Sequence, residues 1–168
     1  MKGRIIAIVL ILCCIAALCG CEKVNDEYLR IHIRANSNLQ EDQAIKLVVR
    51  DEVVKYLTPL LADKKSLSDA KRTVIGHKEE LEKVADIVLR QYGFFYGAKC
   101  SVKVENFPER TYGDLTLKSG RYQAIIIELG EGTGDNWWCV AFPPLCFVGD
   151  GQGEIEYKSI LYEWLKRR

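Results

Sequence analysis

Residues 29–35 read LRIHIRA, a stretch in which apolar and basic side chains alternate without interruption. A period of two is typical of a β-strand, because successive side chains of a strand point to opposite faces of the sheet. One face of this strand is apolar, and the other carries Arg30, His32 and Arg34. We expect the apolar face to pack into the core and the basic face to lie in solvent, where most charged side chains are found.

Apolar residues recur at intervals of three and four after this strand, which is the period of an amphipathic α-helix. The first stripe consists of Ile45, Val49, Val53 and Tyr56. We expect its helix to begin with a capping box at Ser37 or Asn38, and to end or kink at Pro59. A second stripe predicts one continuous helix over residues 68–92, which Gly93 closes.

A period of two returns at residue 98 and predicts further strands over residues 98–105, 111–117, 122–129 and 137–142. The second and third of these flank Ser119-Gly120 and are interpreted as a β-hairpin. The run at 124–127 is apolar on both faces, so we expect it at the centre of the sheet. An amphipathic helix is expected over 157–165. Together with it, the order of strands and helices along the chain predicts a single α+β domain. Its mostly antiparallel sheet is covered by a helical hairpin and a C-terminal helix.

The N-terminus has the pattern of a secretory signal, because two basic residues precede an apolar run at residues 5–18. That run is shorter than the ~20 residues of a membrane-spanning helix. We therefore divide the chain into a signal at 1–20 and one domain at 21–168. Residues 18–21, Leu-Cys-Gly-Cys, resemble a lipoprotein processing box and predict a lipid anchor on Cys21, with plain cleavage nearby as the alternative.

The charge balance argues against nucleic acid as a partner. Removing residues 1–20 takes away two basic residues and no acidic one, which changes the formal net charge from +1 to −1. Nucleic-acid-binding proteins usually carry a clustered basic excess. The basic residues 166–168 are explained by the carbonyl end of a terminal helix.

Residues 134–147 read GDNWWCVAFPPLCF and place two tryptophans between a glycine loop and two prolines. The preceding loop, Gly130 to Gly134, leads into a strand, whereas phosphate-binding loops lead into a helix, so we interpret it as a connection with positive φ angles. Adjacent strand residues point to opposite faces, so Trp137 and Trp138 are both core only if both faces are covered. Otherwise one of them faces out beside Asp135 and Asn136 as an interface anchor.

The cysteines offer two further interpretations. Cys139 could act as a nucleophile with His32 or His77 as base and Asp135 as orienter, although no family-specific catalytic signature surrounds it. A zinc site is disfavoured because six residues separate Cys139 from Cys146, and we expect no metal or cofactor. Export favours a Cys139–Cys146 disulfide, and Cys100 would then be a buried free thiol. A lone histidine such as His77 is more often a satisfied core or boundary residue.

Three stretches together resemble the stage II sporulation protein R family: RIHIRANS at 30–37 with EDQ at 41–43, FPERTYG at 107–113, and GEGTGDNWWCVAFPPLC at 130–146. The resemblance implies a secreted signalling protein of endospore formation, exported from the forespore into the space between two membranes. It implies that the partner is a membrane-embedded aspartic protease, which then processes pro-sigma-E in the mother cell. No catalysis and no small-molecule substrate are required of the chain itself.

Candidate contact residues for this partner are Arg30, His32, Arg34, Asp135, Asn136, Trp137 and Trp138. Whether the basic row meets an acidic partner or only neighbouring carboxylates stays open at this point. An exported thiol-dependent hydrolase acting on the cell wall or on a membrane protein is the alternative function.

Overall fold

The computed structural model describes residues 23–112 and 115–143 of the chain. Its strands are β1 (Asn25–Arg34), β2 (Ala98–Phe107), β3 (Arg110–Tyr112), β4 (Leu115–Leu117), β5 (Gly120–Leu129) and β6 (Asn136–Phe142). Its helices are α2 (Gln40–Leu61), α3 (Leu67–Gly76) and α4 (Lys78–Gln91). The predicted α+β class, with one domain and a mostly antiparallel sheet, is confirmed. The predicted signal at 1–20 and the predicted helix at 157–165 lie outside the described residues.

The main sheet has the strand order β2-β5-β1-β6. β1 runs parallel to β5, and the other two pairings are antiparallel. β5 is therefore central, as its sequence predicts, and all four residues of the run Ala124 to Ile127 are fully buried. A central strand is apolar on both faces because both faces are covered.

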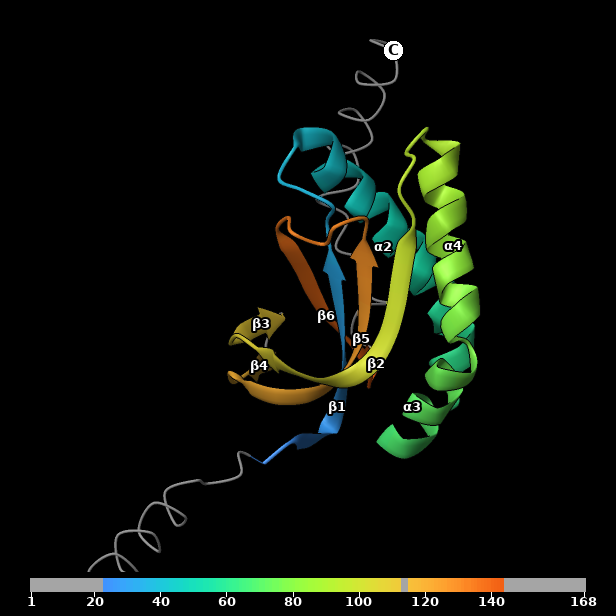
Figure 1. The fold of residues 1–168 in the computed structure, drawn as a ribbon. Helices are drawn as coiled ribbons and strands as arrows, with labels where there is room; N and C mark the ends of the chain where they lie inside the picture. Colours follow the sequence, from blue (N-terminus) through green and yellow to red (C-terminus); the bar gives the residue numbers. More distant parts are fainter. Residues whose placement is uncertain (1–22, 113–114, 144–168) are drawn as a thin grey trace, which may run out of the picture.

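Helices cover one face of this sheet, and the small hairpin β3–β4 lies on the other side (Figure 1). Leu29, Ile31 and Ile33 of β1 face the helices and are fully buried in the larger apolar cluster. From α2 that cluster receives Ile45, Val49 and Val53, as expected from helical spacing, together with Leu57. The fourth predicted member, Tyr56, is only partly buried and packs against the cluster. None of the helices in the described ranges is long and apolar enough to cross a membrane.

The predicted second helix is in fact two helices, α3 and α4, which meet at His77. The apolar stripe runs on through the break, and for this reason the sequence pattern did not reveal it. His77 Nδ1 lies 2.8 Å from the Tyr56 hydroxyl of α2, so His77 is a satisfied boundary residue as expected. Gly93 follows α4 with a φ of 76°, which confirms its role in closing the helix.

The predicted capping box of the first helix is wrong. α2 begins at Gln40 after Leu39, which makes no side-chain cap hydrogen bond. Ser37 Oγ accepts from the Leu39 amide and donates to the buried Asp42, so it fixes the chain before the helix instead. Pro59 lies inside the helix, which continues to Leu61.

The predicted hairpin around Ser119-Gly120 is also wrong. The segment at Leu115–Leu117 pairs with Arg110–Tyr112, whereas β5 pairs with β2 along its whole length. The first part of the outer edge of β2 is covered from the helix layer. Glu82 and Asp86 of α4 accept hydrogen bonds from the backbone amides of Cys100 and Ala98, at 2.8 and 2.7 Å.

Candidate partner-binding site

The basic row Arg30, His32 and Arg34 lies on the sheet face away from the helices, as the strand alternation predicts. The expectation that this row is solvated is wrong, because Arg30 is 0% and His32 5% exposed. A smaller apolar cluster packs on the same face and comprises Phe107, Tyr122, Ala124 and Ile126, with Tyr28 and Trp138 at its margin. Burial of charged groups is costly unless they are paired, so the partners of the row decide how it is tolerated.

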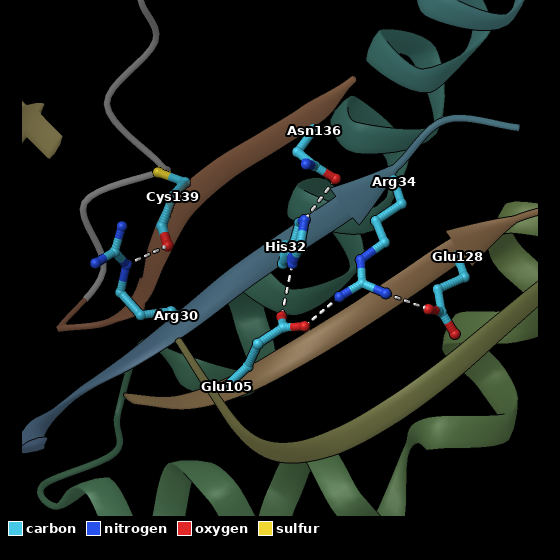
Figure 2. Close-up of polar contacts among 7 residues, drawn as sticks. All are labelled: Arg30, His32, Arg34, Glu105, Glu128, Asn136 and Cys139. Atoms are coloured by element: carbon cyan, nitrogen blue, oxygen red, sulfur yellow. Dashed lines mark hydrogen bonds and ion pairs between the residues drawn. The ribbon is translucent and has the colours of Figure 1, made fainter. Parts of the chain in front are cut away.

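Glu105 of β2 pairs with two members of the row (Figure 2). Its Oε2 lies 2.6 Å from His32 Nδ1, and its Oε1 accepts from Arg34 Nη2. Arg34 also donates to Glu128 of β5 at 2.6 Å. The second nitrogen of His32, Nε2, lies 2.8 Å from Asn136 Oδ1 of β6. Residues of all four strands thus form one polar network across the sheet.

Arg30 is held differently, by aromatic rings and a main-chain carbonyl. Its Nε donates to the Cys139 carbonyl at 3.2 Å and its Nη2 to the Tyr112 hydroxyl at 2.7 Å. The guanidinium carbon lies 4.4 Å from the Phe107 ring centre and 5.0 Å from that of Tyr122, which is cation–π geometry. Burial lowers the pKa of Arg30, against the opposing effect of Tyr112. The Arg30–Tyr112 contact fastens the hairpin β3–β4 to the sheet.

The two tryptophans lie on opposite faces of β6, as predicted, and both are half-buried. Trp138 lies beside His32, with ring centres 5.5 Å apart, and the Arg110 guanidinium covers it at 4.4 Å. Trp137 packs against the helix-side core, and the Arg50 guanidinium lies 5.6 Å from its ring. Neither tryptophan is plain core, and neither is fully exposed.

The glycine loop before β6 is confirmed as a connection with positive φ angles, at Gly130 and Gly132. It is locked to the end of β1. A Cβ at Gly134 would lie 2.1 Å from the Ser37 carbonyl oxygen, so the two backbones pass in direct contact. The Asp135 amide donates to Asn38 Oδ1 at 2.6 Å, and its carbonyl accepts from Lys46 Nζ at 2.8 Å. The backbone of Asp135 is therefore fixed while the residue stays exposed.

Sequence reasoning missed the buried Asp42, which lies at the centre of this lock. Asp42 accepts hydrogen bonds from Asn36 Nδ2, Ser37 Oγ and the Tyr96 hydroxyl. Burial, together with the bond to Asp42, raises the pKa of Tyr96 strongly. The acidic residue five positions after Ser37 was the available signal, but Tyr96 comes from a loop 54 residues away.

Neither of the two described cysteines, Cys100 and Cys139, is paired with a histidine by any hydrogen bond in the described part of the chain. Cys100 is a free thiol, 3% exposed, and burial raises its pKa to about 12, so it is the buried thiol that was predicted. Cys139 is 7% exposed, and its predicted disulfide partner Cys146 lies outside the described residues, as does Cys21. His32 and His77 each bond to other groups. Within 23–112 and 115–143, no three His, Cys, Asp or Glu side chains are grouped to hold a metal ion.

These features define the class of protein. It is a single α+β domain in which the rigid, aromatic edge strand β6 lies beside a buried row of polar side chains, most of which pair with other groups of the same domain. Residues 25–152 match the family model described as stage II sporulation protein R. The chain is also 36% identical over 131 residues to "Stage II sporulation protein R" of Bacillus subtilis (strain 168), a match that covers 78% of this chain. The chain belongs to the stage II sporulation protein R family.

The match covers 58% of the relative's own length, so the chain spans less than two thirds of that protein. No solved structure matches the chain.

Proposed function

We propose that this chain is an exported signalling protein of endospore formation, which activates a membrane-embedded aspartic protease and so triggers processing of pro-sigma-E in the mother cell. The observation that carries the proposal is the family match over residues 25–152. The chain would act in the space between the forespore and mother-cell membranes. A lipid on Cys21 would restrict its diffusion to one membrane surface.

The geometry supports a docking role for the start of β6. Asp135 and Asn136 are exposed, and Trp137 and Trp138 are each partly accessible. Side chains of these kinds on a rigid backbone bind with little loss of conformational entropy, and tryptophan is enriched among residues that dominate binding energy. Arg30, His32 and Arg34 support this surface from below and are not themselves accessible contacts, apart from the part-exposed Arg34.

A thiol hydrolase is less well supported. Both ring nitrogens of His32 bond to Glu105 and Asn136, and His77 lies in the helix layer against Tyr56. A base for Cys139 would need one of these bonds to break. Replacement of Cys139 by serine tests this alternative, since an enzyme would lose function while its fold and partner binding stayed intact.

The proposal is tested by co-expressing the full chain, the protease and pro-sigma-E in a host that does not sporulate. Processing is followed by immunoblot. We expect Trp138→Ala and Asp135→Ala to leave a folded, exported chain that no longer triggers processing, while Ile87→Ala, an exposed apolar residue on α4, serves as the control. Normal processing with both site variants would exclude this surface. Mass spectrometry of the mature N-terminus decides whether Cys21 carries a lipid.

A further inference from the structure

Two guanidinium groups beside the hairpin β3–β4 have no carboxylate partner among the described residues. Arg30 forms no ion pair, and its Nη1 is buried without any hydrogen-bond partner. Arg110 forms no ion pair either, although it is exposed. Arg34, on the same face, is instead neutralised by Glu105 and Glu128. At the hairpin, the positive charge that has no carboxylate partner among the described residues is therefore that of Arg30 and Arg110.

Arg110 is held in place by stacking. Its guanidinium carbon lies 4.4 Å from the Trp138 ring centre. A guanidinium over an aromatic ring still has N–H donors for a second partner, in a fork that matches the two oxygens of a carboxylate. No intramolecular hydrogen bond uses these donors within the described chain. Arg110 is thus oriented for a partner that the described domain does not itself supply.

The buried Arg30 adds a second positive charge close to Arg110. Burial is the main cause that lowers the pKa of Arg30, and the nearby positive charge of Arg110 lowers it further. A buried cation without a counter-charge is unfavourable, and its field is weakly screened because few water molecules surround it. An incoming anion above Arg110 would be attracted by both charges and would relieve their mutual repulsion.

The carboxylates near Arg110 within the described residues do not serve this purpose. Glu105 and Glu128 are occupied by His32 and Arg34. Glu109, which precedes Arg110, is exposed and makes no ion pair with it. A negative group from another molecule is the missing component, and Trp138 beside it offers an apolar surface for the remainder of an acidic side chain.

We propose that Arg110, stacked on Trp138, is the docking point for an aspartate or glutamate side chain in the extracytoplasmic part of the partner protein. This inference rests on the proposed function, since it assigns the chemistry of the contact with the protease. It adds to the surface a residue of the hairpin β3–β4 that was not among the candidate contact residues predicted from the sequence.

The test measures binding of the full chain to the protease in membrane vesicles. Arg110→Glu reverses the charge, and Arg110→Met keeps an apolar cover on Trp138 without a charge. The matched control is Arg72→Glu, an exposed arginine on α3 at the helix side. We expect the dissociation constant to rise at least about tenfold for Arg110→Glu and severalfold for Arg110→Met, with Arg72→Glu unchanged. Thermal unfolding of each variant confirms that the domain is folded.

Wild-type affinity in Arg110→Met would overturn the inference, because the arginine would then serve only to cover Trp138. Equal losses in Arg110→Glu and Arg72→Glu would overturn it too, since the effect would come from net charge. In both cases the wild-type chain still binds the protease, and the proposed function stands. Failure of the wild-type chain to bind or to trigger processing would instead reject the proposed function, and the inference with it.

Discussion

Glu105 Oε2 lies 2.6 Å from His32 Nδ1, and these two residues are 73 positions apart in the chain. Through its other oxygen, Glu105 also holds Arg34. One carboxylate on β2 thus supports two members of the basic row on β1, across the intervening strand β5.

Replacing Glu105 by glutamine should leave His32 and Arg34 without this charge. Removing one member of a largely buried ionic network is costly, and we expect the free energy of unfolding to fall by about 2–3 kcal/mol. Urea denaturation measures this loss. Glu109→Gln, a change of an exposed glutamate nearby, is the control and should alter stability by less than about 0.5 kcal/mol. Equal stability of the two variants would contradict the assigned role of Glu105.

Gly134→Ala should destabilise the domain by roughly 2 kcal/mol or more, because its Cβ would lie 2.1 Å from the Ser37 carbonyl oxygen. The control is Gly76→Ala at the end of α3, where a Cβ would meet nothing within 4 Å. That change should be neutral or stabilising by a few tenths of a kcal/mol. Thermal unfolding of both variants compares them directly. A neutral Gly134→Ala would show that the loop is not locked to β1.

Tyr112→Phe removes the hydroxyl that accepts from Arg30 Nη2. We expect a loss of about 1–2 kcal/mol in stability, because a second nitrogen of a buried guanidinium then lacks a partner. Limited proteolysis should cut the hairpin β3–β4 faster in this variant, since its attachment to the sheet is weakened. Tyr28→Phe is a suitable control, because Tyr28 packs on the same cluster and its hydroxyl makes no intramolecular hydrogen bond in the described chain. Unchanged cleavage would mean that other contacts hold the hairpin.

Cys100 should resist alkylation in the folded protein. Its pKa is raised from 9.0 to about 12 by burial, and the thiolate is the reactive form. In the unfolded chain, labelling should reach half its maximal rate near pH 9, whereas the folded chain would need a pH near 12. Iodoacetamide at pH 8, followed by peptide mass spectrometry, checks this with and without denaturant. Rapid native labelling of Cys100 would be incompatible with its burial at the α4 interface.

The alternation at residues 29–35 predicted correctly which side chains of β1 share a face, and helical spacing predicted most of the core stripe of α2. Both patterns are local, so the sequence contains them in full. The burial of the basic row was not predictable in this way. Its carboxylate partners Glu105 and Glu128 lie 71 to 94 positions away and come into contact only through the order of the strands.

The hairpin was missed for a related reason. β3 and β4 have three residues each, too few for a period of two to distinguish one pairing partner from another. Arg110 belongs to the FPERTYG stretch, but no local pattern assigns it a role, since its contact is with Trp138 in a different sheet.

The carboxylates of Glu82 and Asp86 occupy the backbone donors of Cys100 and Ala98 at the edge of β2. Exposed strand edges recruit further strands and so promote aggregation. Since α4 fills these two donor positions, the first part of this edge is not available to a strand of another molecule. Alanine at both acidic positions would expose the two amides and so favour edge-to-edge pairing.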